Sequence, residues 1–110
     1  MSKFQIFRSS VNNYYYFRFM ASNGEQILSS EAYATKQGCV NGVASVKANA
    51  PYDSTYIRVD NPSNYRFNMK ANNNEIIARS SEGYTTSYNR EHAITLVKRD
   101  APSANVVDLT

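Results

Sequence analysis

The sequence repeats itself, and this duplication constrains the fold more than any other feature. Aligning residues 15–51 with 65–102 gives 15 identities among the 37 positions of the first copy, with Arg79 as one extra residue in the second. A unit of ~50 residues buries too little apolar surface to be comfortably stable alone, whereas two fused copies share one core. We therefore expect pseudo-two-fold packing, an internal dimer within a monomeric chain.

Each copy combines three strand patterns with one helix pattern. In the first copy, aromatic and β-branched residues predict strands over residues 4–8, 14–21 and 25–30. Asn23-Gly24 predicts a two-residue turn of the primed type, with Asn74 in the place of the glycine in the second copy. Thr35, and either Thr86 or Ser87, are expected to cap helices over residues 36–47 and 88–99. Further strands are expected at 56–59 and 106–109, after each helix.

These elements predict an α+β fold with two tandem β(3)-α-β repeats, residues 1–51 and 52–110, in a single domain. The simplest assembly is one mainly antiparallel sheet with both helices on one face. Alternation along the aromatic strands assigns two faces. The face expected in the core carries Tyr15, Phe17, Phe19, Ala21, Tyr65, Phe67, Met69 and Ala71. The face expected to stay open carries Tyr16, Arg18, Met20, Arg66, Asn68 and Lys70.

Several segments together resemble the YegP-like family of small, uncharacterised bacterial proteins, which contain one or two copies of a domain of unknown function. In the first copy they are Tyr15-Tyr16-Phe17-Arg18-Phe19-Met20-Ala21, Asn23-Gly24-Glu25, Ser30-Glu31-Ala32-Tyr33 and Gly42-Val43-Ala44-Ser45-Val46-Lys47. In the second copy they are Phe67-Asn68-Met69-Lys70-Ala71-Asn72 and Ser81-Glu82-Gly83-Tyr84-Thr85. The resemblance implies tandem units that form one sheet and exchange their last strands, and it implies no activity, catalytic residue or cofactor. The chain departs from the family pattern at Asn74 and at Ile94-Thr95-Leu96-Val97-Lys98.

Charge and hydropathy exclude several classes of protein. Twelve Lys and Arg oppose nine Asp and Glu, and the net charge of +3 arises in residues 1–51. No run of five like charges forms a basic tail. No apolar run approaches the ~18 residues of a membrane span, and residues 1–7 lack the apolar stretch of a signal peptide. With Cys39 as the single cysteine, we expect a cytoplasmic protein that binds no membrane.

Few residues suggest chemistry. His92 is the only histidine, and no metal-ligand spacing, phosphate-binding glycine loop or nucleophile elbow is present. Glu31 and Glu82 occupy equivalent positions, and symmetry could bring such carboxylates together for acid–base work. We expect no catalytic residue, metal or cofactor, although a deep pocket lined by Glu31, Glu82 and His92 would indicate an enzyme. Cys39 is expected to be a buried packing residue, with its sensitivity to oxidation left open.

The open face supplies the strongest functional hypothesis. We expect a small, non-enzymatic interaction or accessory module. The sequence does not identify its partner, for which another protein is one candidate. The alternative is a weak, salt-sensitive binder of single-stranded nucleic acid. Tyr16 and Arg18, joined by Phe7, offer aromatic rings beside a cation, and Arg66 and Lys70 add positive charge.

Overall fold

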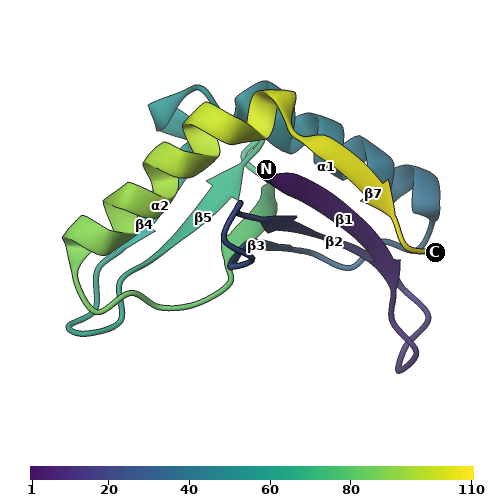
Figure 1. Cartoon of the computed structure of the whole chain (residues 1–110), viewed down its shortest axis with the longest axis horizontal. Coiled ribbons are helices and arrows are strands. Elements are labelled where there is room, and N and C mark those ends of the chain that lie inside the picture. Colours follow the sequence, from purple (N-terminus) through teal and green to yellow (C-terminus); the bar gives the residue numbers. More distant parts are fainter.

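One seven-stranded sheet runs through both repeats in the computed structural model, which describes residues 1–110 (Figure 1). The elements are β1 (Lys3–Arg8), β2 (Tyr15–Met20), β3 (Gln26–Ser30), α1 (Lys36–Asn49), β4 (Tyr56–Val59), β5 (Arg66–Lys70), β6 (Ile76–Ser80), α2 (Ser87–Asp100) and β7 (Asn105–Asp108). The strand order is β4-β5-β6-β3-β2-β1-β7, and every neighbouring pair is antiparallel except β1 and β7. Both helices lie on the same side of the sheet. The predicted α+β architecture is confirmed.

The two repeats meet where β3 pairs with β6. Ser29 lies opposite Arg79, and the flanking pairs are Leu28–Ser80 and Ser30–Ala78. A rotation that swaps residues 28–30 with residues 78–80 converts each flanking pair into the other. The pseudo-two-fold axis therefore passes beside the Ser29–Arg79 pair. This contact makes one sheet out of two hairpins that would each present an open edge.

The strands that follow the helices are exchanged between the halves. β4 leaves α1 of the first repeat and pairs with β5 of the second. β7 leaves α2 of the second repeat and returns to the first, where it pairs in parallel with β1. Each repeat thus supplies a strand to the other, as the family resemblance implied, and α1 also packs against β6 of the second repeat.

The extra residue of the second copy does not lie where the sequence alignment placed it. β3 and β6 span residues 26–30 and 76–80, a constant offset of 50, so Arg79 is the structural equivalent of Ser29. The offset becomes 51 only at the Tyr33 and Tyr84 bridges, which puts the additional residue in the loop 81–83. One residue inserted within a strand would turn all later side chains to the opposite face, whereas a loop absorbs it.

The predicted two-residue primed turn between β2 and β3 is wrong. The amide of Gly24 donates to the Ala21 carbonyl at 3.0 Å, and the amide of Ala21 donates to the Glu25 carbonyl at 2.8 Å. Positive φ occurs at Gly24 (87°) and at the equivalent Asn74 (67°), but not at Asn23. These features describe a three-residue loop that closes with a left-handed residue, and the register shift after Phe19 accommodates it.

The predicted core face is correct for seven of its eight residues, whereas Tyr65 is half-buried outside the cluster with Arg90 5.5 Å from its ring centre. Phe17, Phe19, Phe67 and Met69 are each at most 1% exposed, and they lie in one cluster of 21 buried apolar residues supplied by both repeats. Tyr15 and Ala71, at the strand margins, are partly buried against the same cluster.

Both helices begin at the predicted caps. The hydroxyl of Thr35 accepts the Gly38 amide at 3.0 Å, and the hydroxyl of Thr86 accepts the Asn89 amide at 3.1 Å. A side-chain oxygen at this position satisfies an amide that has no partner within the helix. The caps therefore fix the start of each helix over the sheet.

Substitutions on the two faces of β2 and β5 should have unequal effects on stability. We expect Phe17→Ala and Phe67→Ala each to lower the free energy of unfolding by about 3–5 kcal/mol, because each empties a site in the shared core. Arg18→Ala, on the uncovered face, should cost under about 1 kcal/mol. Urea denaturation of the three variants measures this, and equal losses at Phe17 and Arg18 would contradict the assignment of faces.

Candidate functional site

The uncovered face of the sheet carries basic residues and no acidic residue at its strand positions. Backbone pairing aligns Gln5, Arg18, Ser29, Arg79 and Asn68 in one row across five strands. The basic residues at outward-facing strand positions are Lys3, Arg18, Arg66, Lys70 and Arg79. The only acidic residue in any strand is Asp108, which lies opposite the buried Ile6 and pairs with Lys36 at the start of α1.

Five acidic residues on the helix side are paired with bases. Arg58 contacts Asp53 at 2.9 Å and Glu91 at 2.8 Å, and Lys98 contacts Asp53 at 2.7 Å. The remaining ion pairs on this side are Arg90 with Asp60 and Glu91, Arg99 with Asp100, and Lys36 with Asp108. Five acids thus neutralise five bases beside the helices, which leaves the positive surplus elsewhere.

The cations on the uncovered face mostly contact neutral groups. Arg18 Nε donates to Gln5 Oε1 at 2.7 Å, and its guanidinium lies 4.6 Å from the ring centre of Phe7. Arg66 Nε and Lys70 Nζ donate to the side-chain oxygens of Asn64 and Asn74, at 3.3 and 3.2 Å. The exception in this set is Arg79, which pairs with Glu31 at 2.9 Å. The charges of Arg18, Arg66 and Lys70 therefore remain available to an anionic partner.

Aromatic rings lie on this face only in the first repeat. Phe7 and Tyr16 stack with ring centres 5.8 Å apart and an interplanar angle of 18°. A hollow of about 350 Å³ separates Tyr16 and Arg18 from Gln26 and Ser29 on β3. The structure therefore brings the predicted Tyr16 and Arg18 together with Phe7.

The other two predicted binding residues lie elsewhere on the same face. Arg66 and Lys70 are on β5, three strands away from β2 and thus about 14 Å distant at ~4.8 Å per strand. No aromatic residue occupies an outward-facing position of β5. The four predicted residues share one surface but do not form one compact cluster.

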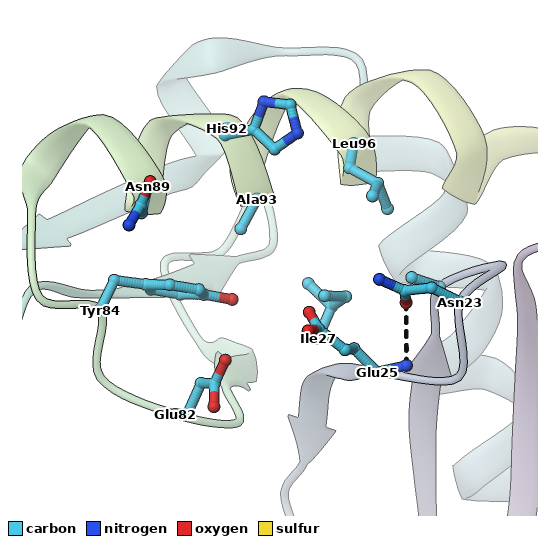
Figure 2. A pocket seen from close by; sticks show the side chains of 10 residues that line it. Asn23, Glu25, Ile27, Glu82, Tyr84, Asn89, His92, Ala93 and Leu96 are labelled. Carbon is cyan, nitrogen blue, oxygen red and sulfur yellow. Dashed lines mark hydrogen bonds between the residues drawn. The ribbon is translucent and has the colours of Figure 1, made fainter.

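A second candidate site lies on the helix side, between the β2–β3 turn of the first repeat and α2 of the second (Figure 2). It is a cavity of about 330 Å³ with an apolar floor and a polar rim. The floor consists of Ala21, Ile27, Ala93 and Leu96, and the rim consists of Asn23, Glu25, Glu82, Asn89 and His92. The sequence pairs Glu82 with its equivalent Glu31, and Glu25 with Glu75, because equivalent positions in two copies do not reveal which turn meets which helix.

Glu31 does not line this cavity. It pairs instead with Arg79 across the junction of the repeats. The structure therefore joins Glu82 to Glu25 and not to Glu31. The predicted trio of Glu31, Glu82 and His92, which would have indicated an enzyme, does not assemble.

Tyr84 has the one buried side-chain polar atom without a hydrogen-bond partner in the protein. Its backbone pairs with Tyr65 at 2.7 and 2.8 Å, which fixes the residue beside the cavity. Its hydroxyl oxygen is buried, has no partner, and points toward Ile27 between α2 and the turn (Figure 2). Burial, followed by the negative charges of Glu82 and Glu25, raises the pKa of Tyr84 to about 12. The phenol is therefore neutral at physiological pH.

Cys39 is fully buried on α1, as the packing interpretation predicted. Burial raises the pKa of its thiol to about 11, so the reactive thiolate is scarce at neutral pH. No group of three or more His, Cys, Asp or Glu side chains converges with the geometry of a metal site. None of the helices has both the length and the apolar character needed to cross a membrane.

Comparison with known proteins gives a family model and curated relatives. The model described as "Domain of unknown function (DUF1508)" matches twice, at residues 10–56 and 60–108. A UPF0339 protein in the ptx operon 5′ region of Stutzerimonas stutzeri is 40% identical over 107 residues, covering 96% of this chain and 95% of that protein. The UPF0339 protein YegP of Escherichia coli K12 is 40% identical over 110 residues, covering 97% and 96%.

Two solved structures share the fold. The solution NMR structure of a UPF0339 protein from Shewanella oneidensis superposes with a TM-score of 0.91 at 34% identity, covering 99% of this chain and 92% of that one. The solution NMR structure of yegP from E. coli, titled a protein of unknown function, gives a TM-score of 0.89 at 38% identity, covering 99% and 93%. The names of these relatives carry no assigned activity.

The ion pairs on the helix side should make stability depend on acid pH. Hydrogen bonds from Arg58, then Lys98, lower the pKa of Asp53 to about 2, below the ~3.9 of an unfolded chain. A depressed folded-state pKa contributes stability above pH ~4 that is lost as the pH falls toward 2. We expect Asp53→Asn to reduce the fall in unfolding free energy between about pH 5 and pH 2. Urea titrations at several pH values measure this, and an unchanged fall would contradict it.

Proposed function

The chain belongs to the DUF1508 family, and from its own geometry we propose that it is a non-enzymatic binding module that takes single-stranded nucleic acid on the uncovered face of its sheet. The observation that carries this proposal is the separation of charge between the two sides of the sheet. Beside the helices, five bases are paired with acids, whereas Arg18, Arg66 and Lys70 face outward with neutral partners. A polyanion gains most from cations that no carboxylate already neutralises.

The spacing of these cations suits an extended strand better than a single small anion. β2, which carries Arg18, and β5, which carries Arg66 and Lys70, lie about 14 Å apart, from three strand spacings of ~4.8 Å. Lys3, on β1, extends the basic surface past Arg18. A flexible phosphate backbone can follow such a line, because each phosphate contacts one cation in turn.

The hollow beside Tyr16 offers a place for a base. Tyr16 and Phe7 are both only partly buried, and the hydroxyls and amide of Ser29 and Gln26 lie on its far side. A nucleobase resting on an aromatic ring gains ~1–3 kcal/mol, and the polar groups opposite can bond to its edge. Because one such hollow lies beside several cations, we expect weak binding with little sequence preference.

An acidic protein is the competing partner, since Tyr and Arg are also common in protein interfaces. Charge alone does not separate the two, but the aromatic hollow favours a ligand with a flat face. The cytoplasmic location and the monomeric state expected from the sequence remain predictions within this proposal. So does the lack of catalysis.

Fluorescence anisotropy with labelled oligothymidylate and oligouridylate of about 12 nucleotides tests the proposal. We expect saturable binding at about 20 mM salt that weakens steeply as salt rises, because counterions are released from the phosphates. Arg18→Ala and Arg66→Ala should each weaken binding by about three- to tenfold and reduce the slope of log K against log salt by roughly 0.7.

Lys47→Ala is the matched control. Lys47 is a cation on α1, on the helix side, with no ion pair but with its ammonium 5.9 Å from the Phe4 ring centre. We expect this variant to retain wild-type affinity. No binding at low salt, or equal losses in the Lys47 and Arg18 variants, would contradict the proposal and favour the acidic protein partner.

A further inference from the structure

We propose that the cavity between the β2–β3 turn and α2 binds a protonated primary amine on a short alkyl chain, held by Glu25, Glu82 and Tyr84. This site lies on the helix side of the sheet and does not depend on the nucleic-acid proposal.

The lining of the cavity matches an amphipathic cation. Its floor, which includes the buried Ile27 and Ala93, would cover an alkyl chain. Glu25 and Glu82 stand exposed on the rim, and neither has an ion-pair partner among the Lys and Arg residues. A cavity of about 330 Å³ holds roughly ten waters at ~30 Å³ each, which is ample for four or five carbons and an ammonium group.

Tyr84 supplies the polar atom that a ligand would satisfy. Its hydroxyl oxygen is fully buried without a hydrogen bond, and it points into the space between the turn and the helix (Figure 2). Buried polar atoms are nearly always paired, so an orphan beside a cavity marks a place for a ligand group. A primary ammonium has three N–H donors, which can reach Glu25, Glu82 and the phenol oxygen of Tyr84.

The equivalent place in the first repeat is closed. There Gly42 stands at the position of Ala93, and a Cβ atom at Gly42 would lie 2.4 Å from the Tyr33 hydroxyl. Tyr33 therefore packs directly against α1, and no cavity of the structure is lined by Tyr33. At Ala93 the methyl group prevents the same close approach of Tyr84, which leaves space between ring, helix and turn.

The ion pairs also favour cation binding in the second repeat and not in the first. Glu31 of the first repeat is neutralised by Arg79 at 2.9 Å. The pseudo-two-fold axis exchanges Arg79 with Ser29, so the second repeat has a serine where the first has the neutralising guanidinium. At the second repeat the Ser29 hydroxyl lies 3.1 Å from the Ser81 hydroxyl, and the adjacent Glu82 has no ion-pair partner, so only this repeat has an open, acidic site.

NMR titration of the full-length protein tests the site with four probes at low salt. The amines are 1,4-diaminobutane, a free diamine, and Nα-acetyl-lysine methylamide, which imitates a lysine side chain of a protein. The uncharged and anionic controls are 1-butanol and butyrate. We expect saturable shifts at Ile27, Tyr84 and Ala93 with the amines only. Whichever amine binds more tightly identifies whether the source is a free amine or a protein lysine.

Isosteric variants separate the proposed contacts from a general effect of charge. Glu82→Gln and Glu25→Gln should each weaken amine binding by about tenfold, and Tyr84→Phe by about threefold. The matched controls, Glu75→Gln and Tyr33→Phe at the equivalent positions of the other half, should leave affinity unchanged. Urea denaturation should show that Tyr84→Phe is no less stable than wild type, since the hydroxyl removed has no partner.

Three results would overturn the proposal. The first is a lack of saturable shifts with either amine up to about 50 mM, a range in which Kd values of ~10 mM are measured. The second is binding of 1-butanol as tight as that of the amines. The third is an equal loss of affinity in the Glu75 and Glu82 variants.

Discussion

The antiparallel contact between β3 and β6 is the interaction on which the rest of the structure depends. It joins two hairpins across the Ser29–Arg79 pair, so that neither presents an open inner edge. Once this pair is formed, the return strands β4 and β7 complete opposite halves, and one apolar cluster extends beneath both helices. A repeat of about 50 residues, too small to bury a sufficient core, thereby gains the second half of its core from its own copy.

The same arrangement determines where charge and cavities remain. The helix side of the sheet holds five acids that are paired with five bases, so the positive surplus is carried mainly by the uncovered face. The pseudo-two-fold axis also sets the β2–β3 turn of one half beside the helix of the other. The two equivalent places then differ, because the second repeat has Ala93 where the first has Gly42, and Ser29 and Arg79 occupy equivalent positions at the junction. Both candidate sites follow from how the copies meet and from where they have diverged.

Local features of the structure could be predicted from the sequence, because strand alternation and helix caps depend on neighbouring residues. Phe17 and Phe67 point inward as alternation requires, and Thr35 and Thr86 cap the helices. Features that depend on backbone register could not be predicted. Sequence identity placed the extra residue at Arg79, whereas strand pairing puts it in the loop 81–83. The sequence also did not indicate that Glu25 lines a cavity with Glu82 and not with its equivalent Glu75, since only the strand order shows which turn lies beside which helix.

Native-state hydrogen exchange on the full chain tests the central claim, that both repeats form one sheet and one core, most directly. If the halves depend on each other, the slowest amides of β2 and β3 and those of β5 and β6 should exchange with the same opening free energy, equal to that of global unfolding. The added denaturant should lower both values with the same slope. A lower opening free energy for one repeat, with the other still protected, would show two separately stable units and contradict this account.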